Sequence, residues 1–115
     1  MVDDHPATVG VISDALQGAG FLVQSAPAGP EAVLQVQAER PDLVILDLAM
    51  PGPDGLDVLF WLRKTEERLP VIVLTARDDE GDREQALFRG ADLYLTKPCA
   101  MAALVAAVGH LLGGP

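Results

Sequence analysis

Four short apolar runs, each bounded by turn-forming residues, constrain the fold of this chain more than any other feature. The runs are too short for typical helices and are apolar at nearly every position, which is typical of strands buried on both faces of a parallel sheet. They read FLVQS at 21–25, LVILD at 43–47, VIVLT at 71–75 and LYLT at 93–96. Longer stretches with helical periodicity lie between them. This alternation predicts an α/β fold, in which right-handed crossovers place helices on both faces of the sheet.

The stretches outside the apolar runs carry Leu, Val, Ile and Ala at the three- and four-residue spacing of amphipathic helices. Pro30 suits the first turn of one such helix, and Gly90 suits the residue that follows the end of another. The expected helices cover about 6–18, 30–39, 55–66, 80–89 and 100–112. Helices and strands therefore alternate along the chain.

The start of the chain departs from this regular alternation. Only Met1 and Val2 precede the acidic pair Asp3–Asp4, so a first strand there is truncated or very short. A shortened strand leaves its neighbours without backbone partners and lowers stability. We therefore expect that about four apolar residues joined upstream of Met1 raise the melting temperature.

Length and composition favour one cytoplasmic domain. The 115 residues suit a single domain over 1–112, followed at 113–115 by a C-terminal tail or the start of a linker. The net charge of −9 argues against direct nucleic-acid binding, which requires a basic surface. No apolar run approaches the roughly 20 residues of a membrane span, and the start MVDDHP does not resemble a secretory signal. The single cysteine, Cys99, fits a reducing compartment.

Polar residues follow the expected strands at the points where the strands end. The carboxyl ends of parallel strands meet at one edge of a sheet, and ligands bind there in open α/β folds. Taken singly, each residue has an ordinary structural role, such as a helix cap for the acidic pair or a solvated charge for the lysine. The residues are Asp3, Asp4, Asp47, Thr75 and Lys97.

Together these residues predict a phosphoryl-transfer site. Several carboxylates at one edge repel each other unless a cation joins them, and oxygen ligands suit a hard cation such as Mg²⁺. The hydroxyl of Thr75 and the ammonium of Lys97 supply the hydrogen-bond donor and the positive charge that a phosphoryl group needs. A carboxylate beside the metal can act as the nucleophile and become an acyl phosphate.

At these positions the chain resembles the CheY-like receiver domains of two-component response regulators, and its later half is most similar to the OmpR/PhoB branch. The resemblance covers essentially the whole chain. It implies a flavodoxin-like, doubly wound sheet of five parallel strands in the order 2-1-3-4-5, with the first strand in the centre. The motifs that carry it are DD at 3–4, D-x-x-M-P-x-x-D-G at 47–55, LTAR at 74–77 and GAD-x-Y-x-x-KP at 90–98.

The resemblance also implies which residues hold the metal. Asp47 is the expected phosphoacceptor and binds Mg²⁺ together with Asp4. The backbone carbonyl of Ala49 is a further expected ligand. Asp3 is expected to act through a metal-bound water.

The remaining motif residues are expected to contact the phosphoryl group or to transmit its presence. Thr75 donates its hydroxyl to the phosphoryl group, and Lys97 pairs with another of its oxygens. Tyr94 is the expected aromatic switch, which turns inward when Thr75 moves. The peptide bond between Lys97 and Pro98 is expected to be cis.

The resemblance implies a signalling switch rather than an enzyme, one that assists only its own phosphorylation and dephosphorylation. Its expected partners are a sensor histidine kinase and a C-terminal DNA-binding effector domain outside this chain. Residues 80–112 form the expected homodimer surface, through which phosphorylation controls the output. Leu93, Ala103 and Ala107 stand where this branch has charged residues, so the usual ion pairs are largely missing and apolar contacts would replace them.

Three other functions share part of this pattern. A haloacid-dehalogenase-like phosphatase needs a second aspartate two residues after its nucleophile, where this chain has Ala49, and a substrate cap for which there is no room. A nucleotide-binding domain needs a glycine-rich phosphate loop after a strand. A receiver-like protein–protein adaptor that is never phosphorylated stays open as the alternative, because the first strand, which positions Asp3 and Asp4, is truncated or very short.

Overall fold

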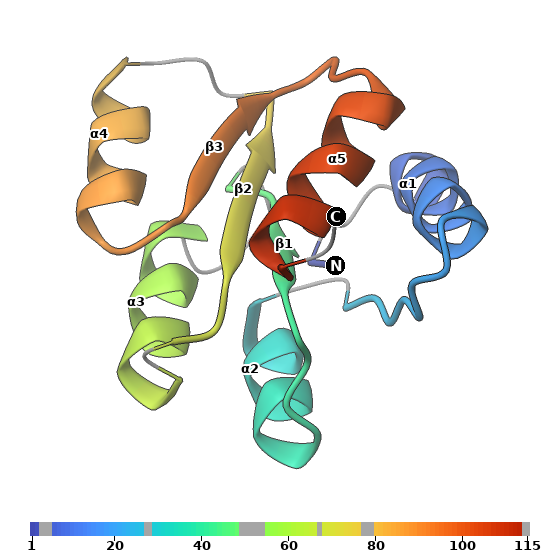
Figure 1. Cartoon of the computed structure of the whole chain (residues 1–115). Helices are drawn as coiled ribbons and strands as arrows, with labels where there is room; N and C mark the ends of the chain where they lie inside the picture. The colour runs from blue at the N-terminus through green and yellow to red at the C-terminus, as the bar shows by residue number, and fades with distance from the viewer. Residues whose placement is uncertain (3–5, 27–28, 49–54, 67, 77–79, 114–115) are drawn as a thin grey trace.

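The computed structural model describes residues 1–2, 6–26, 29–48, 55–66, 68–76 and 80–113 (Figure 1). Within these residues the five predicted helices and three of the four predicted strands are present, and their ends agree with the expected ones to within one or two residues. The elements are α1 (Pro6–Gly18), α2 (Gly29–Ala38), β1 (Val44–Leu46), α3 (Gly55–Thr65), β2 (Val71–Thr75), α4 (Glu80–Phe88), β3 (Leu93–Thr96) and α5 (Met101–Leu111).

The three strands form one parallel sheet in the order β1-β2-β3 within the described residues. Val44 of β1 pairs with Val71 of β2, and Val73 pairs with Tyr94 of β3. Every residue of β1 and β2 is buried. This burial on both faces explains why every residue of β1 and β2 except Thr75 is apolar, instead of alternating with polar residues.

Two apolar clusters pack on opposite faces of the sheet. Val44 and Leu46 belong to the cluster that includes Val36 of α2 and Val58 of α3. Ile45, which points the other way along the strand, belongs to a second cluster. That cluster is built largely by α1 and α5, and Figure 1 shows these two helices side by side, away from α3 and α4. The prediction of helices on both faces is confirmed.

The first strand is reduced to a stub of two residues that pairs on both sides. Val2 forms isolated parallel bridges with Leu46 on one side and with Ala26 on the other. The Val2 nitrogen donates to Ile45 O at 2.7 Å, and Ala26 N donates to Met1 O at 2.9 Å. The stub is the first strand of the expected order, and it lies between the segment that ends at Ala26, which takes the second place, and β1, which takes the third. With β2 and β3 in the fourth and fifth places, the expected order 2-1-3-4-5 is preserved. The described residues thus agree with the prediction that the first strand is truncated or very short.

The predicted strand over 21–25 is wrong. The described chain has no strand there, and only Ala26, just after it, makes a bridge. Leu22 is fully exposed instead of buried. A strand requires a paired neighbour along its length, and the Met1–Val2 stub reaches only Gln24 and Ala26. Among the described residues the sheet consequently shows three regular strands and two isolated bridges, an arrangement consistent with the expected flavodoxin-like fold.

Arg63, near the end of α3, binds backbone groups that lie just before β2 and β3. Its Nη1 donates to Leu69 O at 2.6 Å and its Nη2 to Gly90 O at 2.7 Å. Asp92 Oδ2 lies 3.4 Å from Nη2 and also accepts from the backbone nitrogen of Val71 at 2.8 Å. Gly90 has φ +107°, and a Cβ there would lie 2.8 Å from Arg63 Nε. The glycine and the aspartate of the GAD motif thus hold this arginine.

Arg63→Ala is expected to lower the free energy of unfolding by about 2–4 kcal/mol, because three backbone carbonyls, those of Glu66, Leu69 and Gly90, lose a charged donor. Arg40→Ala is the matched control. Arg40 pairs with Glu66 at 2.9 Å, but the side chains are 45% and 32% exposed, so its loss should cost less than about 1 kcal/mol. Urea denaturation of the two variants measures the difference, and equal losses would contradict the role given to Arg63.

None of the helices in the described ranges combines the length and the apolar character that crossing a bilayer requires.

Candidate functional site

Asp47 is a buried carboxylate at the carboxyl end of β1. It is 3% exposed and lies between Leu46 and Leu48, which are buried as well. Its backbone nitrogen donates to Val2 O at 3.0 Å, so the N-terminal stub helps to position it. Burial of a carboxylate is costly unless a positive charge or a donor compensates it.

Lys97 supplies that positive charge. Its Nζ donates to Asp47 Oδ2 at 3.1 Å, and the lysine side chain is 20% exposed. The contact joins residues 50 positions apart in sequence, at the edge where β1 and β3 both end. The structure therefore brings together two of the residues that the sequence predicts at this edge.

Thr75 lies between the two, at the end of the central strand β2. It is completely buried, and its carbonyl accepts a hydrogen bond from Lys97 N at 2.8 Å. Thr75 also pairs with Thr96 across the β2–β3 ladder. The carboxyl ends of three adjacent parallel strands thus carry Asp47, Thr75 and Lys97, which places these residues at one edge of the sheet.

Two further predicted residues lie within the described chain. Tyr94 on β3 is 5% exposed and belongs to the same apolar cluster as Val73 and Ala86. The peptide bond between Lys97 and Pro98 is cis. The predicted residues Asp3, Asp4 and Ala49 lie outside the described residues. Among the residues that are described, no group of three or more His, Cys, Asp or Glu side chains gathers as a metal site.

Gly55 is a residue of the site region whose contact was not predicted from the sequence. It is the first residue of α3, and a Cβ at this position would lie 2.5 Å from Leu48 Cα and 3.1 Å from Asp47 O. The helix therefore starts in direct contact with the backbone that carries the carboxylate. The only sequence signal for this contact is the D-G pair at 54–55.

Gly55→Ala is expected to lower the free energy of unfolding by about 2–3 kcal/mol, because a methyl group there overlaps backbone atoms that cannot move alone. Gly109→Ala is the matched control, since a Cβ at Gly109 in α5 meets nothing within 4 Å. That change should raise stability by about 0.5–1 kcal/mol, as alanine restricts the unfolded chain. Thermal unfolding followed by circular dichroism separates the two, and a neutral Gly55→Ala would refute the contact.

The sequence matches the family model described as the response regulator receiver domain over residues 1–109. The chain belongs to this family. It is therefore a receiver domain of two-component response regulators, a regulatory domain. The sequence-based recognition of the family is confirmed, and so is the CheY-like fold.

Relatives among characterised proteins carry regulator names. The response regulator MprA of Mycolicibacterium vanbaalenii is 43% identical over 112 residues, which are 97% of this chain and 48% of that protein. The transcriptional regulatory protein TrcR of Mycobacterium tuberculosis is 39% identical over 112 residues, or 97% of this chain and 44% of that protein. The receiver domain thus spans about half the length of the curated relatives it matches.

Solved receiver domains superpose closely on this structure. The receiver domain of the Francisella response regulator 1452 has a TM-score of 0.91 at 31% identity, covering 97% of this chain and 93% of that one. The receiver domain of NtrX from Brucella abortus has a TM-score of 0.92 at 25% identity, covering 99% and 97%. The structure therefore has the architecture of these receiver domains.

Proposed function

We propose that this receiver domain is a phosphorylation switch in which Asp47 accepts a phosphoryl group from the phosphohistidine of a sensor histidine kinase. The observation that carries the proposal is the buried Asp47 carboxylate, 3% exposed, with Lys97 Nζ 3.1 Å from its Oδ2. A surface aspartate would be solvated and weakly positioned. A carboxylate held at the edge of the sheet beside a fixed ammonium is placed to act as a nucleophile.

The transfer exchanges one bond for another. A carboxylate oxygen of Asp47 attacks phosphorus, the P–N bond to the histidine breaks, and the released imidazole nitrogen takes up a proton. Lys97 remains within reach of the acceptor and offsets negative charge on the phosphoryl oxygens. The hydroxyl of Thr75, at the end of the adjacent strand, donates to another of these oxygens.

The proposed cofactor is Mg²⁺. The chain offers oxygen donors of the kind that this ion prefers: the Asp47 carboxylate, with Asp4, the Ala49 carbonyl and Asp3 through water as the further proposed ligands. Mg²⁺ would supply charge neutralisation between the acceptor carboxylate and the incoming phosphoryl group. The buried position of Asp47 fits this role, because burial of a carboxylate is costly unless positive charge compensates it.

The proposed response passes from Thr75 to Tyr94. Phosphorylation adds about two negative charges and new acceptor oxygens, which attract the Thr75 hydroxyl. Tyr94 pairs with Val73, which lies two residues before Thr75 on β2, and belongs to the same apolar cluster as Ala86 of α4. A shift of Thr75 therefore changes the packing next to Tyr94 and biases the surface formed by α4, β3 and α5 toward a second state.

The proposed partners follow from the family and from the names of the relatives. A sensor histidine kinase supplies the phosphoryl group, and the setting is the cytoplasm. Residues 1–112 form the receiver domain, and residues 113–115 begin a linker to a transcription-regulating, DNA-binding effector domain. A homodimer forms through residues 80–112 by apolar contacts, since Leu93, Ala103 and Ala107 cannot form ion pairs.

Incubation of the purified chain with acetyl phosphate and Mg²⁺, followed by intact-mass spectrometry, tests this function. The chain should gain the mass of one phosphate, and an excess of a chelator should suppress the gain. If a folded sample gains none, the protein–protein adaptor becomes the better interpretation. A gain that the chelator does not change would refute the proposed role of Mg²⁺.

A further inference from the structure

Helix α3 carries two stripes of side chains, one on each of its opposite faces. The inner stripe is buried and packs toward the sheet, and it consists of Gly55, Val58, Leu59 and Leu62. The outer stripe repeats the same spacing of three, one and three residues, and it consists of Asp57, Phe60, Trp61 and Lys64. The solvent face of a helix normally carries polar residues. Here the two central positions of that face are aromatic.

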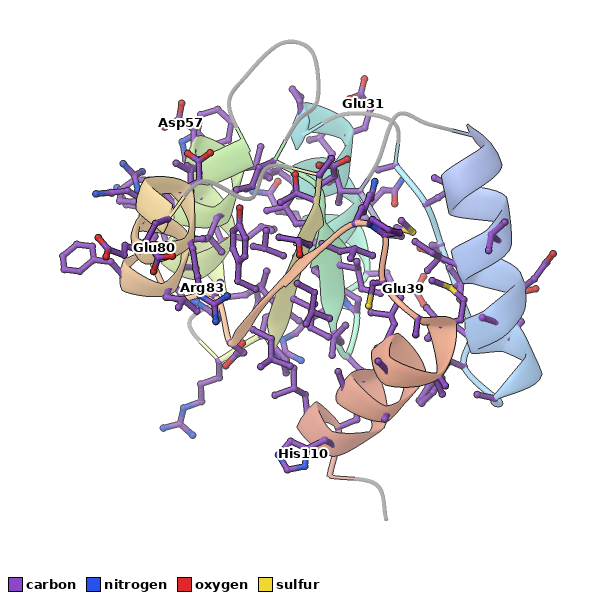
Figure 2. All side chains as sticks on the ribbon, turned by 90° about the horizontal axis from the view of Figure 1, so that it is seen from above. Glu31, Glu39, Asp57, Glu80, Arg83 and His110 are labelled. Atoms are coloured by element: carbon purple, nitrogen blue, oxygen red, sulfur yellow. The ribbon has the colours of Figure 1, made fainter. Side chains whose placement is uncertain are left out.

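The outer stripe is exposed to solvent. Phe60 is 49% exposed and Trp61 is 42% exposed, whereas aromatic side chains of this size usually bury most of their surface in a core. Figure 2 shows Asp57 at the periphery of the molecule. Adjacent exposed aromatic residues with charged residues around them are typical of protein contact sites. The outer stripe is therefore a candidate contact surface.

Contacts within the molecule hold this surface in place. Lys64 Nζ lies 5.8 Å from the centroid of the Phe60 ring. Asp57 Oδ1 lies 3.9 Å from Nη1 of Arg89, the residue that follows α4. Arg63 Nη2 donates to Gly90 O at 2.7 Å, which joins α3 to the same region. A contact surface that is already ordered loses little conformational entropy when it binds.

The order of the outer stripe is complementary to its own reverse. From Asp57 to Lys64 it reads as an acidic residue, two aromatic residues and a basic residue. Two copies of α3 that pack antiparallel would place Asp57 of each copy opposite Lys64 of the other. The aromatic residues of both copies would then meet in the middle. A contact across a two-fold axis requires this kind of self-complementary surface.

We propose that the outer stripe of α3 is a self-association surface, through which two copies of this chain pair with their α3 helices antiparallel. The two-fold axis passes between Phe60 and Trp61. The charges favour a second copy over other occupants. The chain has a net charge of −9, so two copies repel each other over much of their surface, but the outer stripe itself has no net charge. An acidic peptide or an anionic membrane would complement only the lysine end of the stripe.

The size of the surface predicts a weak and reversible dimer. The exposed parts of Phe60 and Trp61 offer about 100 Å² each, and the flanking charged side chains add to this area. The total remains below the roughly 1,200 Å² that stable dimers bury. The surface lies on α3, outside residues 80–112, so pairing through it requires no phosphorylation of Asp47 and leaves α4, β3 and α5 accessible.

Sedimentation velocity of the unphosphorylated chain tests whether the outer stripe associates. The sedimentation coefficient should rise between about 10 µM and 1 mM protein. The emission of Trp61, the only tryptophan, should shift to shorter wavelengths over the same range, because pairing removes water from its ring. Phe60→Ser should weaken association by about tenfold or more. Leu34→Ser is the matched control, since Leu34 is 65% exposed but lies on α2, and it should change nothing.

A charge exchange tests the antiparallel arrangement. Asp57→Lys and Lys64→Asp each place like charges opposite one another in a pair of identical chains, so each should weaken association by about fivefold or more. An equimolar mixture of the two variants restores both opposite-charge contacts and should associate within about twofold of the unchanged chain. Arg89→Gln removes only the contact between Arg89 and Asp57 within one chain, and it should leave association nearly unchanged.

A chain that stays monomeric up to about 1 mM would overturn the proposal. Association that persists in Phe60→Ser would also overturn it, because the copies would then meet through another surface such as residues 80–112. A mixture of the two charge variants that associates no better than either alone would refute the antiparallel arrangement. All samples are free of phosphoryl donors, so these results are independent of the function proposed for Asp47.

Discussion

Asp47→Asn is expected to abolish phosphate uptake from acetyl phosphate, whereas the unchanged chain gains one phosphate. Asparagine keeps the shape of the buried side chain, but its amide oxygen is not a competent nucleophile for an acyl phosphate. The packing between Leu46 and Leu48 is preserved, so the variant should fold. Intact-mass spectrometry measures the difference directly.

Asp57→Asn is the matched control for this prediction. Asp57 lies on α3 with its side chain 61% exposed, 3.9 Å from Arg89 Nη1, and Figure 2 shows it at the periphery of the molecule. Loss of this exposed carboxylate should leave phosphate uptake unchanged, because a solvated carboxylate has no fixed ammonium or metal to assist attack. Uptake that persists in Asp47→Asn and disappears in Asp57→Asn would contradict the assignment of the acceptor.

Lys97→Met is expected to lower the free energy of unfolding by about 3 kcal/mol at neutral pH. Methionine matches the length of the lysine stem, so the change removes mainly the ammonium that lies 3.1 Å from Asp47 Oδ2. The carboxylate is 3% exposed and cannot turn to water without disturbing the end of β1. The variant should also take up phosphate much more slowly, since negative charge gathers at Asp47 without its positive neighbour.

A double-mutant cycle separates the ion pair from other effects of the lysine. In the Asp47→Asn background no charge remains at the acceptor, so Lys97→Met should then cost about 1 kcal/mol or less. Urea denaturation of the four chains gives the coupling energy. A cost for Lys97→Met that is the same in both backgrounds would show that the Asp47–Lys97 contact contributes nothing to stability.

Three strands could be predicted from the sequence, namely β1 and β2, which are buried at every residue, and β3, which is only partly buried. The runs that became β1 and β2 are apolar except for Asp47 and Thr75 at their ends, and such runs are buried only when both faces of a sheet are covered. The run at 21–25 has similar composition but is not a strand. Whether this run pairs as a strand depends on how far the neighbouring first strand extends. The composition of the run itself does not reveal the length of that neighbour.

The candidate site was predictable where strand topology alone brings residues together. Three adjacent strands end at or next to Asp47, Thr75 and Lys97. Parallel pairing places these residues at one edge of the sheet, independently of how the helices pack. The contacts of Gly55 with Leu48 and of Arg63 with Gly90 were not predictable in this way. They depend on how closely a helix approaches the sheet, and glycine and arginine also occur in helices at positions that make no such contact.

Chemical trapping of the phosphorylated residue examines the acceptor assignment in the unaltered chain. After treatment with acetyl phosphate and Mg²⁺, sodium borohydride reduces an aspartyl phosphate to homoserine, which tandem mass spectrometry locates within a peptide. Homoserine at position 47 and at no other aspartate is the expected result. Homoserine at a different aspartate, or a retained phosphate without any homoserine, would contradict the assignment of Asp47 as the phosphoacceptor.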